Sequence, residues 1–134
     1  MTSEAVRRVQ SGSPWEDSFG FARAVAAGDH VIVAGTTAFK GDLLYGDGDP
    51  YEQTKVAFAT AVEAIGEFGL DIESVIRTRV YLAHSRDVDE VGRAHKELFD
   101  TVRPVTTLLV VEGFMDSRVL VSVEVEAYRG AVDS

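Results

Sequence analysis

The sequence contains no cysteine among its 134 residues. This absence excludes a disulfide framework, a zinc site with thiolate ligands and a cysteine nucleophile. Long apolar runs are also missing: nowhere do about 18 apolar residues follow one another, and Met1–Trp15 has no apolar segment of the signal-peptide kind. The sequence therefore predicts neither a membrane span nor secretion, and we expect a protein of the cytoplasm.

Basic side chains are few, with 13 Lys and Arg against 22 Asp and Glu, which gives a formal net charge of −9. An acidic chain is a poor match for the phosphate backbone of a nucleic acid, so we do not expect nucleic acid as the main partner. Only three prolines occur, and no repeat or low-complexity linker divides the chain. We expect a single domain over residues 1–134, which at this length can bury about two-thirds of its unfolded surface.

Segments with strand character lie at both ends of the sequence. Residues 21–27 and 30–36 flank Gly28-Asp29, a favourable two-residue turn, and predict a hairpin. The segment 75–82 predicts a strand whose alternation sends Ile76, Thr78, Val80 and Leu82 to one face and Arg77, Arg79 and Tyr81 to the other. Two further strands are predicted over residues 106–111 and 118–128.

Two helices are predicted between these strands. Asp49 can cap the first helix and Pro50 suits its first position, while Gly66 and Gly69 bring it to an end. Its apolar stripe consists of Tyr51, Phe58, Val62 and Ile65. The second helix begins near Ser85 or Asp87 and ends at Arg103-Pro104, because a residue before proline is driven out of the helical region. Its stripe consists of Val88, Val91, His95, Leu98 and Val102.

The order β-β-α-β-α-β-β predicts an α+β domain with two helices on one face of a mixed sheet. The other face of the sheet then also needs a cover. Along residues 121–127, apolar residues alternate with Ser122, Glu124 and Glu126. With only two helices to supply it, we expect part of this surface to meet other subunits.

Charged residues on the predicted strands leave two interpretations open. Glu124 and Glu126 fit either a solvated polar face or a carboxylate that orients a water molecule. Arg77 and Arg79 fit either ion pairs or an anchor for a ligand carboxylate. His95 on its apolar stripe is typical of a hydrogen-bonded core or interface histidine. The three scattered histidines predict no metal site, and no nucleotide-binding motif is present, so we expect no cofactor.

Taken in order, several segments resemble the Rid (reactive intermediate deaminase) family, also called the RidA/YjgF family. The resemblance extends from about residue 10 to about residue 129. The segments that carry it are Ser-Gly-Ser-Pro-Trp-Glu at 11–16, Gly-Asp-His-Val-Ile-Val-Ala-Gly-Thr at 28–36, the strand 75–82, Arg-Pro-Val-Thr-Thr at 103–107 and Val-Glu-Val-Glu-Ala at 123–127.

This resemblance implies a chorismate-mutase-like α+β fold and a homotrimer, with the sheets lining a central barrel and ligand clefts between adjacent subunits. It implies a small-molecule ligand and no bound cofactor. Active members of the family hydrolyse enamines and imines to 2-keto acids and ammonia, using an arginine to hold the substrate carboxylate and a glutamate to position water.

Carried over position by position, the family's glycine falls on Gly35, its glutamate on Glu124 and its tyrosine on Phe21. Its arginine falls on Thr106, beside Thr107. A neutral hydroxyl cannot form a bidentate charged pair, a loss of about 1–3 kcal/mol in binding. We hypothesise that Arg79 takes over this role. Further departures are Ala34 for a serine, Leu108 for a cysteine and Gly92 for an asparagine, and the other candidates for the lost charge are Arg77 and Arg103.

Two functions therefore stay open, with a third that is weaker. The first is imine deamination or a related hydrolysis in a cleft around Phe21, Gly35, Thr106, Thr107 and Glu124, with Glu124 as the catalytic residue. The second is a non-catalytic trimer that binds a metabolite or regulates a partner. The weaker alternative is an endoribonuclease, against which the acidic net charge and the lack of a cationic track count.

Overall fold

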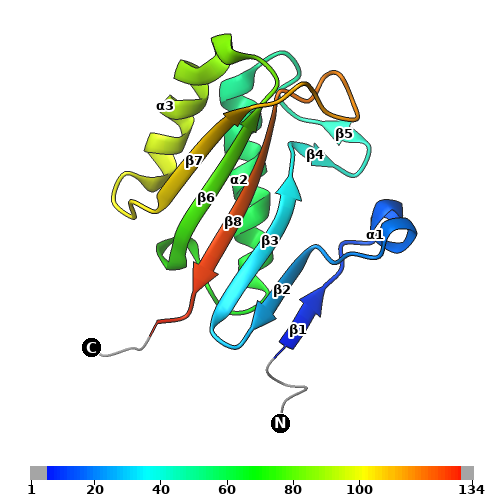
Figure 1. The fold of residues 1–134 in the computed structure, drawn as a ribbon, viewed down its shortest axis with the longest axis vertical. Coiled ribbons are helices and arrows are strands. Elements are labelled where there is room, and N and C mark those ends of the chain that lie inside the picture. Colours follow the sequence, from blue (N-terminus) through cyan, green and yellow to red (C-terminus); the bar gives the residue numbers. More distant parts are fainter. Residues whose placement is uncertain (1–5, 131–134) are drawn as a thin grey trace.

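The computed structural model describes residues 6–130, which form a six-stranded mixed sheet with two long helices against one face (Figure 1). The strand order is β1-β2-β3-β8-β6-β7. Neighbouring strands are antiparallel except β6 and β7, which run parallel. The strands are β1 (Val6–Val9), β2 (Ala24–Ala27), β3 (His30–Thr36), β6 (Val75–Leu82), β7 (Val105–Val110) and β8 (Val121–Tyr128). The predicted α+β class and mixed sheet are confirmed.

Two helices pack against the sheet, and the remaining elements are short. The two helices are α2 (Pro50–Gly66) and α3 (Val88–Phe99). The side chain of Asp49 accepts a hydrogen bond from the Glu52 amide at 3.1 Å, so the predicted N-cap of α2 is confirmed. The others are α1 (Pro14–Phe19), the single 3-10 turns η2 (Ile72–Ser74) and η3 (Ser85–Asp87), and the small hairpin of β4 (Phe39–Lys40) and β5 (Leu43–Leu44).

The core lies between α2, α3 and one face of the sheet. Phe58 and Ile65 of α2 are fully buried, as the predicted stripe requires. Tyr51 and Val62 of that stripe are only half-buried, because α2 packs through small residues that let its backbone approach the sheet. The buried residues of α2 are Gln53, Thr54, Ala57, Phe58, Ala61, Ala64 and Ile65.

Three local expectations differ from the structure. The helix α3 ends at Phe99, and residues 100–104 form the turn into β7. The strands β2 and β8 begin at Ala24 and Val121, later than predicted. In β6 the register against β8 shifts between Val75 and Arg77, so Val75 is buried and Ile76 is exposed. Strict alternation predicted Ile76 on the same face as Thr78, Val80 and Leu82, and these three are buried.

The opposite face of the sheet is open, since neither α2 nor α3 covers it (Figure 1). We call this surface the open face. Within residues 6–130, none of the helices combines the length and the apolar character that crossing a membrane requires.

Candidate functional site

Glu124 lies at the centre of a polar cluster on the open face. Arg79 of β6 stands directly opposite Glu124 of β8 in the antiparallel register. The Arg79 Nη1 atom lies 3.3 Å from Glu124 Oε1, and the Tyr81 hydroxyl donates to the same oxygen at 3.1 Å. Among the described residues, no donor reaches Glu124 Oε2. One carboxylate oxygen is thus held by two donors while the other remains available to a ligand or a water molecule.

A second ion pair continues this cluster along the strands. Arg77 stands opposite Glu126, with 3.2 Å between Arg77 Nε and Glu126 Oε1. The two pairs border a cavity of about 160 Å³ whose apolar side comes from β3. Its lining residues are Ile32, Val33, Ala34, Arg77, Arg79, Glu124, Val125 and Glu126. The cavity therefore offers both charges and an apolar wall to a small molecule.

Tyr81 is a neutral donor in this cluster. Partial burial raises the pKa of Tyr81, and the charge of Glu124 together with its hydrogen bond raises it further. The phenol therefore keeps its proton around pH 7 and donates it to the carboxylate. Strand alternation predicts Tyr81 on the face of Arg79, and this position is the only local signal in the sequence for its contact with Glu124.

Thr106 belongs to the other face of the sheet. It pairs with Thr78 in the parallel register of β6 and β7, and their hydroxyl oxygens lie 2.8 Å apart. The Thr78 hydroxyl is also 2.9 Å from His95 Nε2, while Thr106 Oγ1 lies 3.4 Å from that nitrogen. Thr106 is therefore engaged by residues of its own chain on the face toward His95 of α3, although Thr106 itself is exposed.

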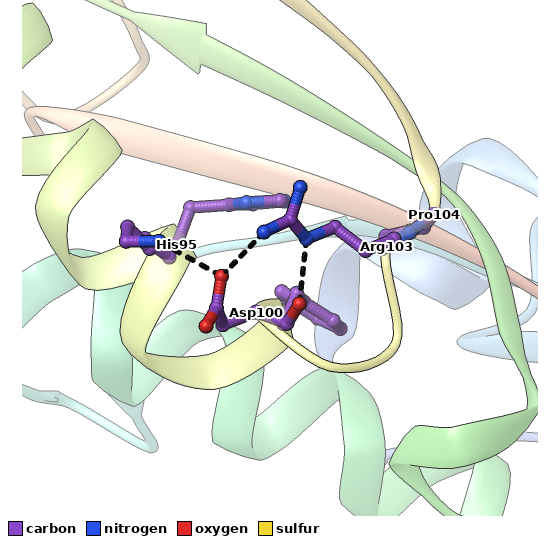
Figure 2. Close-up of a pocket in the computed structure, with 6 residues that line it drawn as sticks. His95, Asp100, Arg103 and Pro104 are labelled. Carbon is purple, nitrogen blue, oxygen red and sulfur yellow. Dashed lines mark hydrogen bonds and ion pairs between the residues drawn. The ribbon is translucent and has the colours of Figure 1, made fainter.

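His95 connects Thr106 with a second cavity at the end of α3. Its ring packs against Phe58 and Phe99, with centroids 5.5 and 4.7 Å away, and burial lowers its pKa, so the imidazole is neutral at pH 7. The cavity, about 210 Å³ in volume, is shown in Figure 2. Its lining residues are His95, Lys96, Phe99, Asp100, Arg103 and Pro104.

The two cations of this second cavity are already paired. Lys96 Nζ and Arg103 Nη2 each lie 2.8 Å from Asp100 Oδ1. Figure 2 draws the contacts of Arg103 with Asp100 as dashed lines. Arg103 has a φ of 56°, in the left-handed region that residues with a side chain rarely adopt. Its Nε donates to the Asp100 carbonyl at 2.6 Å, a bond that satisfies a carbonyl at the end of α3.

Gly35 lies in β3 and Phe21 lies before β2. In the strand order, both strands are on the opposite side of β8 from β6, the strand of Arg79. Gly35 falls where the register between β3 and β8 shifts, and a Cβ there would lie 3.3 Å from the hydroxyl of Ser122. Phe21 precedes β2, and its side chain is 40% exposed. Its carbonyl accepts a hydrogen bond from Gln10 at 3.2 Å.

The predicted site residues are thus brought together only in part. Arg79 and Glu124 are in contact, and Thr107 pairs with Arg79 in the register of β6 and β7. Within one chain, Thr106 and Phe21 do not line the cavity that contains Glu124. A cleft that holds all of these residues needs a second copy of the chain, so its existence stays a prediction. In residues 6–130, no group of three or more metal-binding side chains is arranged around one point.

Comparison with known proteins gives concordant matches. A model of the family described as endoribonuclease L-PSP matches residues 16–129. A protein of Streptomyces coelicolor, named an uncharacterized protein, is 91% identical over 134 residues and is matched over 100% of both chains.

Solved structures show the same fold. The crystal structure of Rv2704 from Mycobacterium tuberculosis, a member of the YjgF/YER057c/UK114 family, is 36% identical with a TM-score of 0.83, covering 92% of this chain and 99% of that one. The structure of E. coli TdcF with bound serine is 17% identical with a TM-score of 0.76, covering 92% of this chain and 94% of that one. At the latter identity, the likeness concerns the fold alone.

Proposed function

Because this chain belongs to the endoribonuclease L-PSP family, which is also called the RidA/YjgF family, we propose that it hydrolyses the C=N bond of small imine carboxylates. The products are a 2-keto acid and ammonia. The observation that carries the proposal is the convergence of Arg79 and Tyr81 on one oxygen of Glu124, at 3.3 and 3.1 Å. This arrangement fixes the carboxylate and leaves its second oxygen for water.

Each group has a defined part in the proposed reaction. Glu124 Oε2 accepts a proton from water as the water oxygen bonds to the imine carbon, and Glu124 then passes this proton to the nitrogen. The resulting carbinolamine loses its C–N bond, ammonia leaves and the hydroxyl oxygen becomes the carbonyl. Arg79 holds the substrate carboxylate through N–H groups that Glu124 does not use. The atoms balance as imine plus water giving keto acid plus ammonia.

Substitution of Glu124 and Arg79 tests this assignment with 2-iminopropionate as substrate. In Glu124→Gln we expect kcat to fall by about 100-fold or more, because an amide cannot accept the proton. In Arg79→Gln we expect KM to rise by roughly 5- to 150-fold, since the charged pair with the carboxylate is lost. Glu63→Gln, an exposed change on α2, serves as the control and keeps wild-type rates. Wild-type kinetics in both site variants would remove the assignment.

A homotrimer is part of the proposal. The open face is uncovered, and Thr106 and Phe21 can share a cleft with Glu124 only if different copies contribute them. Residues Thr106 and Thr107 point to opposite faces, so a cleft that includes both must include the edge of the sheet, where β7 lies. A neighbouring copy placed along this edge would complete such a cleft.

A second candidate is binding without turnover. It is favoured by Thr106, whose hydroxyl is already engaged by Thr78 and His95, at the position where the family resemblance implies an arginine that holds the substrate carboxylate. Since TdcF is a fold relative with bound serine, L-serine is a suitable first probe. Binding without catalysis predicts that serine raises the melting temperature while 2-iminopropionate is not hydrolysed.

The ribonuclease alternative finds less support on the open face. Arg77 and Arg79 alternate with Glu126 and Glu124, so positive and negative charges neutralise each other there. A phosphate backbone is bound by a continuous basic track. RNA cleavage by nuclease-free protein that is abolished in Glu124→Gln would overturn this judgement.

A further inference from the structure

The short helix α1 buries a charged residue and exposes its aromatic residues. The side chain of Glu16 lies inside, with the residue only 2% exposed, while Trp15 and Phe19 are 48% and 71% exposed. Moving a carboxylate out of water is costly unless charges and hydrogen bonds compensate for the lost hydration. An apolar residue at position 16 would be buried without this loss of hydration. The contacts of Glu16 are therefore where a role for the buried carboxylate has to be found.

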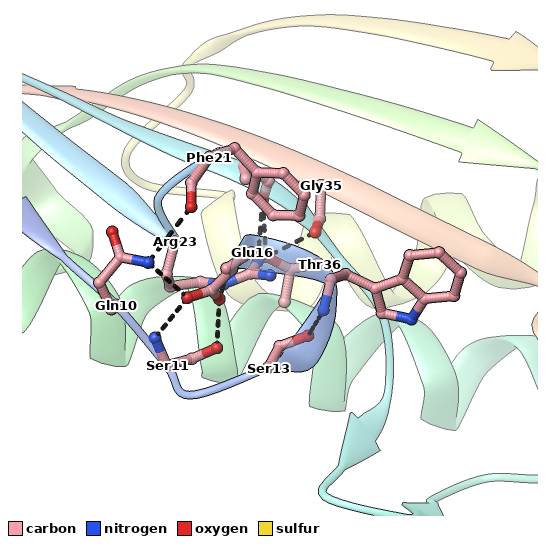
Figure 3. Close-up of polar contacts among 10 residues, drawn as sticks. Gln10, Ser11, Ser13, Glu16, Phe21, Arg23, Gly35 and Thr36 are labelled. Carbon is pink, nitrogen blue, oxygen red and sulfur yellow. Dashed lines mark hydrogen bonds and ion pairs between the residues drawn. The ribbon is translucent and has the colours of Figure 1, made fainter. Parts of the chain in front are cut away.

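Glu16 is surrounded by donors from the segment that precedes α1 (Figure 3). Gln10 Nε2 and the Ser11 amide each donate to Oε1 at 2.9 Å, and the Ser11 hydroxyl donates to Oε2. Arg23 Nε lies 3.8 Å from Oε2. Burial alone would raise the pKa of Glu16, but the bonds from Ser11 and the charge of Arg23 hold it below its usual range. The carboxylate is therefore ionised at neutral pH.

The other end of Arg23 contacts the irregular part of β3. Its Nη1 donates to the Gly35 carbonyl at 3.0 Å, to the Ala34 carbonyl at 3.5 Å and to Thr36 Oγ1 at 3.1 Å. The Thr36 hydroxyl in turn donates to the Ala34 carbonyl at 2.8 Å. These bonds span the place where the register between β3 and β8 shifts, so Arg23 connects Glu16 with this bulge (Figure 3).

The bulge forms one side of the candidate site. Ala34 lines the cavity that contains Glu124 and Arg79. Gly35 lies against Ser122, two residues before Glu124 on the same face of β8. A shift of the bulge would therefore change the distance between the apolar wall and the carboxylate.

We propose that Glu16 and Arg23 are positioning residues, which hold the Ala34–Thr36 bulge at the correct distance from Glu124. Neither touches the cavity, and both act through the backbone carbonyls of β3. This inference rests on the proposed function for its catalytic consequence. Its structural part, the fixing of the bulge, stands independently of any activity.

The test compares Arg23→Gln, Arg23→Lys and Glu16→Gln with Lys55→Gln. The control removes another ion pair of 3.8 Å, between Lys55 of α2 and Glu97 of α3. Hydrogen exchange of the amides of residues 34–36, measured against those of α2, reports local opening apart from global stability. For Arg23→Gln we expect about 10-fold faster exchange at residues 34–36, no comparable change in α2, and partial rescue by lysine.

Kinetics of 2-iminopropionate hydrolysis give the second readout. With the bulge misplaced by a fraction of an ångström, we expect kcat of Arg23→Gln to fall about 10- to 100-fold at a temperature where the variant is fully folded. Unchanged exchange at residues 34–36 overturns the proposal, and so does a lower melting temperature with wild-type kcat and KM. If wild-type protein shows no hydrolysis, the proposed function fails, while the exchange data alone still decide whether the pair holds the bulge.

Discussion

His95 lies between two aromatic rings and two threonine hydroxyls. Phe58 and Phe99 pack against its ring, and Thr78 and Thr106 are within 2.9 and 3.4 Å of its Nε2. The sequence predicted a hydrogen-bonded histidine on the apolar stripe, and this is confirmed. The partners could not be predicted locally, because Thr78 and Thr106 are 17 and 11 positions away and reach His95 only through the parallel pairing of β6 with β7.

The buried imidazole makes stability dependent on pH. Burial lowers the pKa of His95 below its usual 6.5, so in acid the unfolded chain takes up the proton before the folded chain does. We therefore expect the free energy of unfolding to decrease as pH falls through about 6.5, until the lower pKa of the folded state is reached. Denaturant titrations at several pH values should show a shallower slope in His95→Gln. His84→Gln, an exposed histidine, is the control, and an equal slope in His95→Gln and wild type would contradict the prediction.

At the scale of elements, the start of α2 depends on a single side chain. Asp49 accepts a hydrogen bond from the Glu52 amide, and Pro50 occupies the first helical position. Asp49→Ala is expected to lower the free energy of unfolding by about 1 kcal/mol, since one amide at the helix start loses its acceptor. Chemical denaturation measures this loss. Asp42→Ala, in the exposed turn between β4 and β5, should leave stability unchanged, and an equal effect of both changes would argue against the cap.

The long elements were predictable because their patterns are local. The strand over Val75–Leu82 and the start of the helix at Pro50 follow from alternation and capping, and both are found. The helix α1 was missed, because six residues that expose Trp15 and Phe19 give no apolar stripe toward the core. The exposure of Ile76 was missed for another reason: a register shift depends on the partner strand and is invisible in one segment.

The part of the candidate site that follows from strand alternation could be predicted from the sequence. Alternation placed Arg79 with Tyr81, and the antiparallel pairing then set Arg79 against Glu124. The Glu16–Arg23 contact escaped prediction, because it joins α1 to β3 through side chains whose spacing follows no periodic pattern. Whether one cleft collects Phe21 and Thr106 depends on the assembly and stays a prediction.

At the scale of the whole molecule, the helices cover one side of the sheet and leave the other side open (Figure 1). The edge strand β7 adds apolar surface: Val105, Leu109 and Val110 are 64%, 43% and 52% exposed. An exposed apolar edge strand favours pairing with another chain. This arrangement supports self-association, and the family resemblance implies three copies.

Sedimentation of the purified protein tests the assembly. We expect a species with three times the mass of one chain, and a shift toward single chains in Leu109→Lys, because a charge buried between copies loses its hydration. Val88→Lys, which changes an exposed apolar residue on α3, should keep the wild-type mass. A wild-type protein that remains a single chain at high concentration would contradict the prediction, and with it the cleft between subunits.

The central place of β8 has a consequence for biosynthesis. The strands β1, β2 and β3 lie on one side of β8, and β6 and β7 lie on the other, so only β8 joins the two halves of the sheet. Among the described strands, Val121–Tyr128 is also the one that is translated last. We expect the two halves to stay separate until β8 has been synthesised, so the inner sides of both halves are prone to aggregation until this strand inserts between them.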